Sequence, residues 1–275
     1  MGIVNVTPDS FSDGGLYLDA DAAVAHGHRL LADGADIVDV GGESTRPGAP
    51  AVDAGEEQRR VEPVVRELAD TGASVSIDTS KAAVAEAALD AGAQVVNDVT
   101  AFGAEPDLAD LCADRGCGVV LMHMQGTPRT MQENPAYDDV VDDVRAFLAA
   151  RIAFAVARGV DEDAIWVDPG IGFGKTVEHN LELLRRLGEL RALGRPILIG
   201  TSRKSFLGRL TGRDGAARLG GTIASNVLAL RNGAEAFRVH DVREVRDALL
   251  VAEAVLGRRE WGTDERLARA AAAGR

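Results

Sequence analysis

The sequence predicts an α/β protein, namely a single-domain (β/α)8 TIM barrel. Short apolar runs alternate with amphipathic helical segments in eight successive units, which indicates parallel strands joined by helical crossovers. Nearly every run ends in a polar or charged residue, as expected when eight loops meet at one face. An open, doubly wound sheet is the rival topology, but it would gather functional residues at one switch point. The length of 275 residues suits one barrel.

The first half of the chain contains four predicted strands, each followed by a helix. Asp53 is a suitable N-cap for the second helix, whereas Gly34 and Gly92 end the first and third. The predicted strands are residues 1–6, 37–42, 75–78 and 95–98, and the helices are residues 20–33, 53–71, 81–91 and 106–115.

The second half repeats this alternation. Pro169 ends the sixth strand because proline has no amide hydrogen to donate. The predicted strands are residues 118–122, 165–168, 196–201 and 236–241; the helices are residues 137–159, 180–193 and 216–232, with a last one ending near residue 256. Residues 1–256 are therefore assigned to the barrel and residues 257–275, which are polar and alanine-rich, to a C-terminal tail.

Composition and charge restrict the partners. A hydrophobic fraction of 46% allows a sizeable core. A net charge of −13 opposes binding to nucleic acid or an anionic membrane, and any anionic ligand would need a local cationic site. Cys112 and Cys117 are too few for a disulfide scaffold and are expected to be free thiols. No run approaches ~18 apolar residues and no signal peptide is indicated, so the cytoplasm is the expected location.

The polar residues at the strand ends form a predicted ring. Any single one of these residues could have only a structural role, as a helix cap or at the rim of the barrel. A whole ring at one mouth is not readily explained by structural roles, because each unpaired buried polar group costs about 1–3 kcal/mol. Its members are Asn5, Asp39, Asp78, Asn97, His123, Asp168, Lys204, Arg238 and His240.

The residue types in this ring indicate two kinds of recognition. The first group contains hydrogen-bond acceptors, an amide and a cation, which suit a flat heterocycle that carries amino, lactam and ring-nitrogen atoms. The second group suits an anion such as phosphate. The first group is Asp78, Asn97, Asp168 and Lys204, and the second is Asn5, Arg46, Arg238 and His240.

The glycine-rich loop after the sixth strand allows backbone or ligand to come close, since Gly170, Gly172 and Gly174 carry no side chain. It superficially resembles a nucleotide-binding P-loop. That motif requires glycine where this chain has Pro169, so a nucleoside triphosphatase is not expected.

Eight motifs together resemble those of the bacterial dihydropteroate synthases, a family of pterin-binding TIM barrels. Two are long and specific, M-G-I-V-N-V-T-P-D-S-F-S-D-G-G from Met1 and D-V-G-G-E-S-T-R-P-G-A from Asp39. The others are S-I-D-T-S-K from Ser76, N-D-V from Asn97, L-M-H-M-Q-G from Leu121, D-P-G-I-G-F-G-K from Asp168, S-R-K-S from Ser202 and R-V-H-D from Arg238.

The resemblance implies an enzyme of folate synthesis that joins p-aminobenzoate to 6-hydroxymethyl-7,8-dihydropterin diphosphate, releasing diphosphate and 7,8-dihydropteroate. It implies a Mg²⁺ cofactor, a homodimer and a target of sulfonamides, which resemble p-aminobenzoate. Asp78, Asn97, Met122, Asp168 and Lys204 would hold the pterin; Thr45, Arg46, Arg238 and His240 the diphosphate; Pro47, Phe173 and Ser205 the p-aminobenzoate; Asn5 and Asp13 would serve the metal. Catalytic roles would fall to Asp13, Asp78, Lys204, Arg238 and His240.

Two other functions remain open. A pterin-dependent methyltransferase would share the barrel but would not need the diphosphate-binding residues. A catalytically silent, pterin-binding paralogue would be expected to lose loop residues, whereas Asp13, Thr45 and Arg46 are present.

Overall fold

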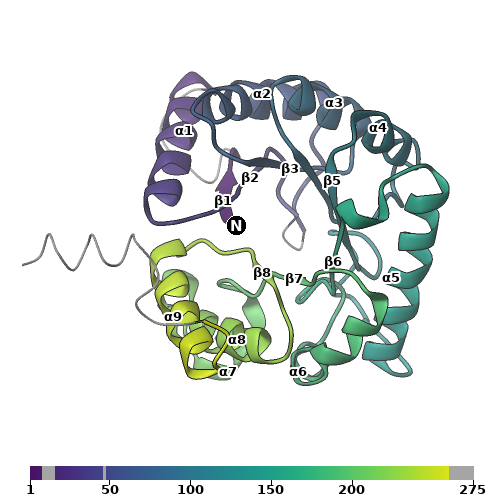
Figure 1. Ribbon diagram of the computed structural model, residues 1–275, viewed down its shortest axis with the longest axis vertical. Coiled ribbons are helices and arrows are strands. Elements are labelled where there is room, and N and C mark those ends of the chain that lie inside the picture. The colour runs from purple at the N-terminus through teal and green to yellow at the C-terminus, as the bar shows by residue number, and fades with distance from the viewer. Residues whose placement is uncertain (8–15, 46–47, 260–275) are drawn as a thin grey trace, which may run out of the picture.

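A ring of parallel strands surrounded by helices forms the protein (Figure 1). The computed structural model describes residues 1–7, 16–45 and 48–259. Six strands form one sheet in the order β1-β2-β3-β4-β5-β6, and β7 pairs with β8. Their bounds are β1 Gly2–Asn5, β2 Val38–Gly41, β3 Val75–Asp78, β4 Val95–Asp98, β5 Gly118–Met122, β6 Ile165–Asp168, β7 Leu198–Ile199 and β8 Ala236–Phe237.

Backbone hydrogen bonds close the ring on both sides of the β7–β8 pair. Val167 donates to the carbonyl of Pro196 at 3.0 Å, which joins β6 to the β7 segment. Ile3 donates to Val239, and Val239 donates to Met1, both at 3.0 Å, so the last strand segment meets the first. The predicted TIM barrel is therefore confirmed, and an open doubly wound sheet is excluded.

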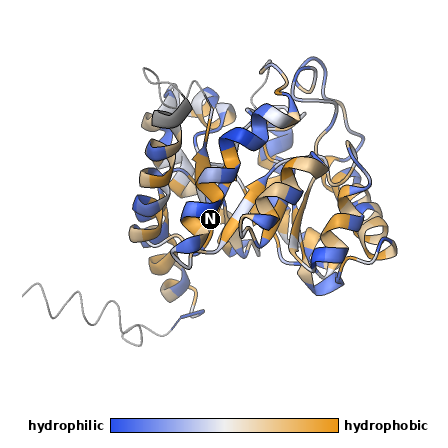
Figure 2. Cartoon of the chain, turned by 90° about the horizontal axis from the view of Figure 1, so that it is seen from above, coloured by the Kyte–Doolittle hydropathy of each residue, from blue (hydrophilic) through white to orange (hydrophobic). Residues whose placement is uncertain are grey.

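The helices bury one side against the strands. Figure 2 shows helices with a hydrophobic and a hydrophilic side. Asp53 caps the second helix as predicted, accepting from the amides of Gly55 and Glu56. The helices are α1 Leu16–Ala32, α2 Ala54–Asp70, α3 Ala82–Asp90, α4 Leu108–Arg115, α5 Val140–Ala157, α6 Val177–Arg185, α7 Ser205–Thr211, α8 Leu219–Arg231 and α9 Val242–Val255. No helix in the described part is long and apolar enough to cross a membrane.

Several predicted elements of the second half were wrong in extent. Strands β7 and β8 are each two residues long, because pairing after β8 passes from β7 to β1: Arg238 donates to Ile199 but Val239 donates to Met1. The predicted helix 180–193 is α6 followed by a 3-10 helix, Leu187–Leu193. The helix predicted over residues 216–232 begins as a 3-10 turn, Gly215–Arg218.

Helix α7 was not predicted, since its seven residues are too few to show a helical period. The predicted tail lies outside the described residues from residue 260 onward.

Candidate active site

The register of the sheet places four predicted strand ends at one level. Asn5 pairs with Gly41, Gly41 with Asp78, and Asp78 with Asn97, so these residues lie side by side on β1 to β4. Neighbouring strands are about 4.8 Å apart, which brings the side chains within contact range. A side chain at Gly41 would bring its Cβ to 3.3 Å from that of Asp78, so glycine leaves the room that this carboxylate occupies.

Arg238 connects the last strand segment to the first strands across the mouth of the barrel. Its Nε donates to Asp39 Oδ2 and its Nη2 to Asp78 Oδ2, both at 2.6 Å. Asn97 Nδ2 donates to the same oxygen of Asp39 at 3.1 Å. Burial lowers the pKa of Arg238, but the negative charges of Asp39 and Asp78 have a larger effect in the opposite direction, so the pKa is raised. The cation is therefore held in place by two anions.

Asp78 has an unusual acidity. Burial raises its pKa to about 7, even though Arg238 acts in the opposite direction. The nearby carboxylates of Asp39, Glu57 and Asp98 contribute to this rise. Near neutral pH this group is therefore poised between its acid and its carboxylate form, which is typical of residues that take part in catalysis.

Asp168 and Lys204 bring opposite charges to the mouth, near enough for each to affect the pKa of the other. Asp168 Oδ1 accepts from the amide of Gly170 at 2.6 Å. Burial raises the pKa of Asp168 and lowers that of Lys204 to about 8, while the opposite charge of the partner works against each shift. Lys204 Nζ donates to the carbonyl of Ile171 and lies 4.5 Å from the centroid of the Phe173 ring.

The two charged groups converge at Gly200, just after β7. The Cβ of a residue there would lie 3.8 Å from Lys204 Nζ and 3.9 Å from both Asp168 Oδ2 and Arg238 Cβ. Four predicted site residues, Asp78, Asp168, Lys204 and Arg238, thus meet at one end of the barrel.

Side-chain donors immobilise the glycine-rich loop after β6. Its consecutive carbonyls accept from four side chains: Ile171 from Lys204, Gly172 from Gln132, Phe173 from Lys175 and Gly174 from Tyr137. Gly170 has φ +67°, and a Cβ there would lie 1.8 Å from the carbonyl oxygen of His123. The predicted close approach of backbone is confirmed at Gly170 and Gly174, whereas the nearest atoms at Gly172 belong to the side chain of Lys204.

Lys175 was not predicted as a site residue. It is buried, and its Nζ lies 2.9 Å from Nδ1 of His123. Burial lowers the pKa of Lys175 well below its ordinary value; burial and Lys175 together lower that of His123 to about 3. His123 is therefore a neutral ring packed edge-on against Phe147, which is a structural role. The sequence feature that could have indicated Lys175 is the scarcity of lysine, since the chain contains only Lys81, Lys175 and Lys204.

His240 is fixed by Ser202. The backbone amide of His240 donates to Ser202 Oγ at 3.2 Å, and this hydroxyl lies 2.9 Å from His240 Nδ1. When the hydroxyl donates to Nδ1, the ring proton of a neutral imidazole is on Nε2. Arg203, the residue between Ser202 and Lys204, pairs with Asp241 and has φ +56°. The loops after β7 and β8 are thus joined.

The remaining predicted residues follow the carboxyl ends of other strands. Met122 ends β5 level with Asp168 and is buried, and Asn5 ends β1 and is partly exposed. Thr45 follows β2, and Ser205 begins α7. Three predicted residues lie outside the described part of the chain: Asp13, Arg46 and Pro47.

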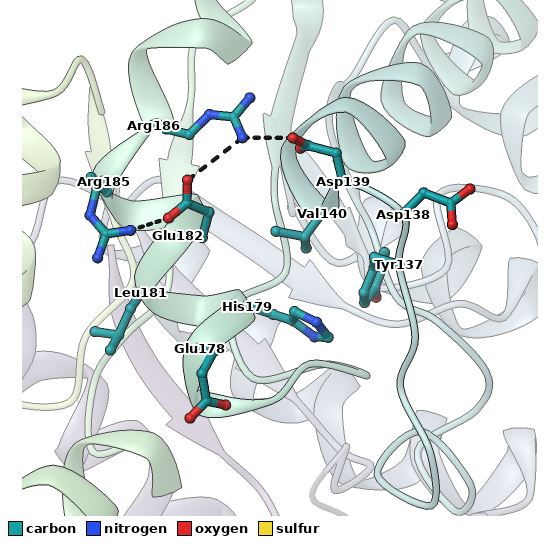
Figure 3. A pocket seen from close by; sticks show the side chains of 10 residues that line it. All are labelled: Tyr137, Asp138, Asp139, Val140, Glu178, His179, Leu181, Glu182, Arg185 and Arg186. Atoms are coloured by element: carbon teal, nitrogen blue, oxygen red, sulfur yellow. Dashed lines mark hydrogen bonds and ion pairs between the residues drawn. The ribbon is translucent and has the colours of Figure 1, made fainter.

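Two hollows lie elsewhere. One of about 510 Å³ lies between the start of α5 and α6, where Arg186 pairs with Asp139 and Glu182 (Figure 3). Another of about 270 Å³ includes Met1 and Trp166 in its lining. None of the described residues that line them is a predicted site residue, so the charged barrel mouth remains the candidate site.

Comparison with known proteins agrees with this site. Residues 1–240 match the family described as pterin binding enzyme. The dihydropteroate synthase of Mycobacterium leprae is 52% identical over 263 residues, which cover 93% of each chain. The chain belongs to the dihydropteroate synthase family.

Solved structures of this family share the fold. The dihydropteroate synthase of Xanthomonas albilineans with 4-aminobenzoic acid is 50% identical, with a TM-score of 0.87 over 93% of this chain and 92% of that one. The same organism's enzyme in complex with 7,8-dihydropteroate is 47% identical, with a TM-score of 0.85 and the same coverage. The resemblance found in the motifs is confirmed, and the barrel mouth described above is the candidate active site of a dihydropteroate synthase family member.

Proposed function

We propose that the barrel mouth joins p-aminobenzoate to 6-hydroxymethyl-7,8-dihydropterin diphosphate, forming 7,8-dihydropteroate and free diphosphate. The observation that carries this proposal is the meeting of Asp78, Asp168, Lys204 and Arg238 at one end of the barrel. Relatives with about half of their residues identical to this chain have been solved with 4-aminobenzoic acid and with 7,8-dihydropteroate.

The pterin is proposed to lie against Asp168, Lys204 and Asn97, with Met122 packing beside it. Asp168 Oδ2 faces the same space as Lys204 Nζ, so an ionised carboxylate and an ammonium are available to one ligand. The carboxylate can accept two hydrogen bonds from a guanidine-like edge, whereas the ammonium can donate to a carbonyl or ring nitrogen.

The other substrate groups are proposed to lie nearer the loops. Thr45, Arg238 and His240 would contact the diphosphate, and Phe173 with Ser205 would border p-aminobenzoate. Asp13, Arg46 and Pro47 remain proposals from the motifs, since they lie outside the described residues.

The chemistry follows from charge. An aniline amine is a weak nucleophile, so catalysis must come mainly from stabilising the departing diphosphate. Arg238 and His240 can donate to its oxygens as negative charge develops there. The carboxylate of Asp78 can stabilise the positive charge left on the electron-rich pterin, so no covalent enzyme intermediate is needed.

Magnesium is proposed as the cofactor, with Asn5 as one ligand. An amide oxygen at the end of β1 suits this hard cation. No cluster of three or more His, Cys, Asp or Glu side chains that could hold a metal occurs in the described part of the chain. Because Mg²⁺ commonly binds through one or two protein groups and substrate phosphates, diphosphate oxygens are proposed as further ligands, and Asp13 stays a proposal from the motifs. When bound, the ion would neutralise charge on the leaving diphosphate.

A homodimer is proposed through α7 to α9. Large apolar side chains are exposed there, including Leu228 at 53%, Val251 at 65% and Val255 at 81%. Leu228 lies on α8 and Val251 and Val255 lie on α9, which packs against α8, and exposed apolar surface of this kind is typical of association surfaces. Analytical ultracentrifugation should show a dimer that Val255→Lys dissociates; a monomeric parent would contradict the proposal.

The cytoplasm is the proposed location, since Cys112 and Cys117 are both buried and unbridged.

A diphosphate-release assay tests the main proposal. Release should require both substrates and fall when Mg²⁺ is chelated. Pterin binding without release would favour a silent paralogue, and methyl transfer from methyltetrahydrofolate would favour the methyltransferase.

A further inference from the structure

A cluster of three charged residues lies at the base of the loop between β2 and α2. Lys81 Nζ donates to Glu43 Oε2 and to Glu57 Oε2. The three residues come from different elements: Glu43 follows β2, Glu57 is on α2, and Lys81 is the N-cap of α3. The cluster therefore joins the loop to two neighbouring helices.

Glu43 also joins the two ends of its own loop. Its Oε1 accepts from the backbone amide of Val52 at 3.2 Å, so one carboxylate closes the segment between residues 43 and 52. Arg60 reinforces the first end by donating to the carbonyl of Gly42 at 3.0 Å. Within the segment, Gly48 donates to the carbonyl of Pro128 at 3.2 Å, which is a contact with another loop.

The arrangement depends on Lys81. Glu57 is fully buried, and its Oε1 has no hydrogen-bond partner among the described residues. A buried carboxylate without a cation is strongly unfavourable. Burial lowers the pKa of Lys81, but the hydrogen bonds and charges of Glu43 and Glu57 outweigh burial and raise it, so the lysine keeps its positive charge.

The segment closed in this way carries Thr45, two residues after Glu43. Because Thr45 is so near in the chain to Glu43, the contacts of Glu43 determine the position of the Thr45 hydroxyl. We propose that Glu43 and Lys81 are positioning residues that hold this segment at the barrel mouth for the substrate's diphosphate. The inference rests on the proposed function, because the diphosphate is part of the proposed substrate.

The test compares Glu43→Ala and Lys81→Met with Lys81→Arg, which keeps the charge. Arg66→Met is the matched control, since it breaks an exposed ion pair with Glu62 on the same helix. In both disrupting variants, the KM for the pterin diphosphate should rise about tenfold with kcat changed less than about threefold, as expected when ground-state binding is lost. Lys81→Arg should restore most of the affinity, and Arg66→Met should match the parent.

Two further measurements separate positioning from general damage. Binding of 6-hydroxymethylpterin, which lacks the diphosphate, should be unchanged in all variants. The Val52 amide should exchange its hydrogen faster in Glu43→Ala, whether or not the enzyme is active. If Glu43→Ala does not fold, Lys81→Met decides the kinetic test, and the amides of Gly48 and Val52 should exchange faster in that variant.

The outcomes distinguish the two proposals. A parent enzyme that releases no diphosphate overturns the proposed function, and the exchange of Val52 still tests whether Glu43 holds the segment. An active parent whose disrupting variants keep its KM and its exchange rates overturns the positioning roles and leaves the function intact.

Discussion

Arg238 and Asp78 are 160 positions apart in the chain, yet Nη2 of the arginine lies 2.6 Å from Oδ2 of the aspartate. The same guanidinium donates to Asp39, so one cation contacts two inward-facing carboxyl groups. This contact connects the last strand segment to β2 and β3. It also makes the pKa of Asp78 depend on the position of Arg238, which is proposed to contact the diphosphate.

Replacing Arg238 by Met should destabilise the protein. Removing one partner of a buried pair leaves the carboxylates of Asp39 and Asp78 uncompensated, and we expect a loss of about 3 kcal/mol in the free energy of unfolding at pH 7. The loss should shrink as pH falls below about 7, the pKa of Asp78, because this carboxyl group is then protonated and no longer needs the cation. Urea unfolding at several pH values measures this. A variant with parental stability at neutral pH would contradict it.

Replacing Asp78 by Asn should slow turnover about 100-fold while pterin binding is partly retained, since the amide keeps the shape but cannot stabilise positive charge. In the parent, kcat/KM should rise with pH through about 7, the pKa of Asp78, as the carboxylate forms. Steady-state kinetics across pH tests both. An unchanged turnover number in Asp78→Asn would rule out the electrostatic role.

Asp78 should also affect stability in a defined pH window. Its pKa in the folded state, about 7, lies above the ordinary value of 3.8, so the folded protein binds more protons than the unfolded chain between these values. The free energy of unfolding contributed by this group therefore falls as pH rises from about 4 to about 7. Relative to the parent, Asp78→Asn should become more stable as pH rises through this window. A difference that does not depend on pH would argue against the raised pKa.

Lys204 should make pterin affinity fall at alkaline pH. Burial lowers its pKa to about 8, so the ammonium that is proposed to contact the pterin is lost as pH rises through that value. Lys204→Met should weaken binding of 6-hydroxymethylpterin about tenfold or more at pH 7, in line with a lost charged hydrogen bond, and should lack this alkaline decline. Isothermal titration calorimetry is the measurement, and a decline that persists in the variant would assign it to another group.

Gly170 should tolerate no side chain. A Cβ there would lie 1.8 Å from the carbonyl oxygen of His123 at φ +67°, so Gly170→Ala must displace the backbone and should cost about 3 kcal/mol of unfolding free energy. Gly220→Ala is the control, because it lies in α8 with nothing within 4 Å of the new Cβ, and should stabilise by up to about 1 kcal/mol. Thermal melting compares them; equal stabilities would mean that the loop after β6 can move freely.

The order of the strands and the polar residues at their ends followed from the sequence alone. Periodicity and turn residues are local properties, so β1 to β6 were placed almost correctly. The parallel topology then required the strand ends to share one face, which predicted that Asp78, Asp168, Lys204 and Arg238 would meet. The lengths of β7 and β8 were predicted wrongly, because the ends of these strands depend on which distant strand each residue pairs with, and periodicity does not show this.

Only the tertiary structure decided which side chain pairs with which. Arg238 could have been free for a ligand, yet it donates to Asp39 and Asp78, and His123 lies against Lys175 and Phe147. Likewise, nothing local to Glu43 indicates that it closes its own loop against Lys81. These pairings depend on distances between groups remote in the chain, and the pKa values depend on burial, so both exist only once the barrel has closed.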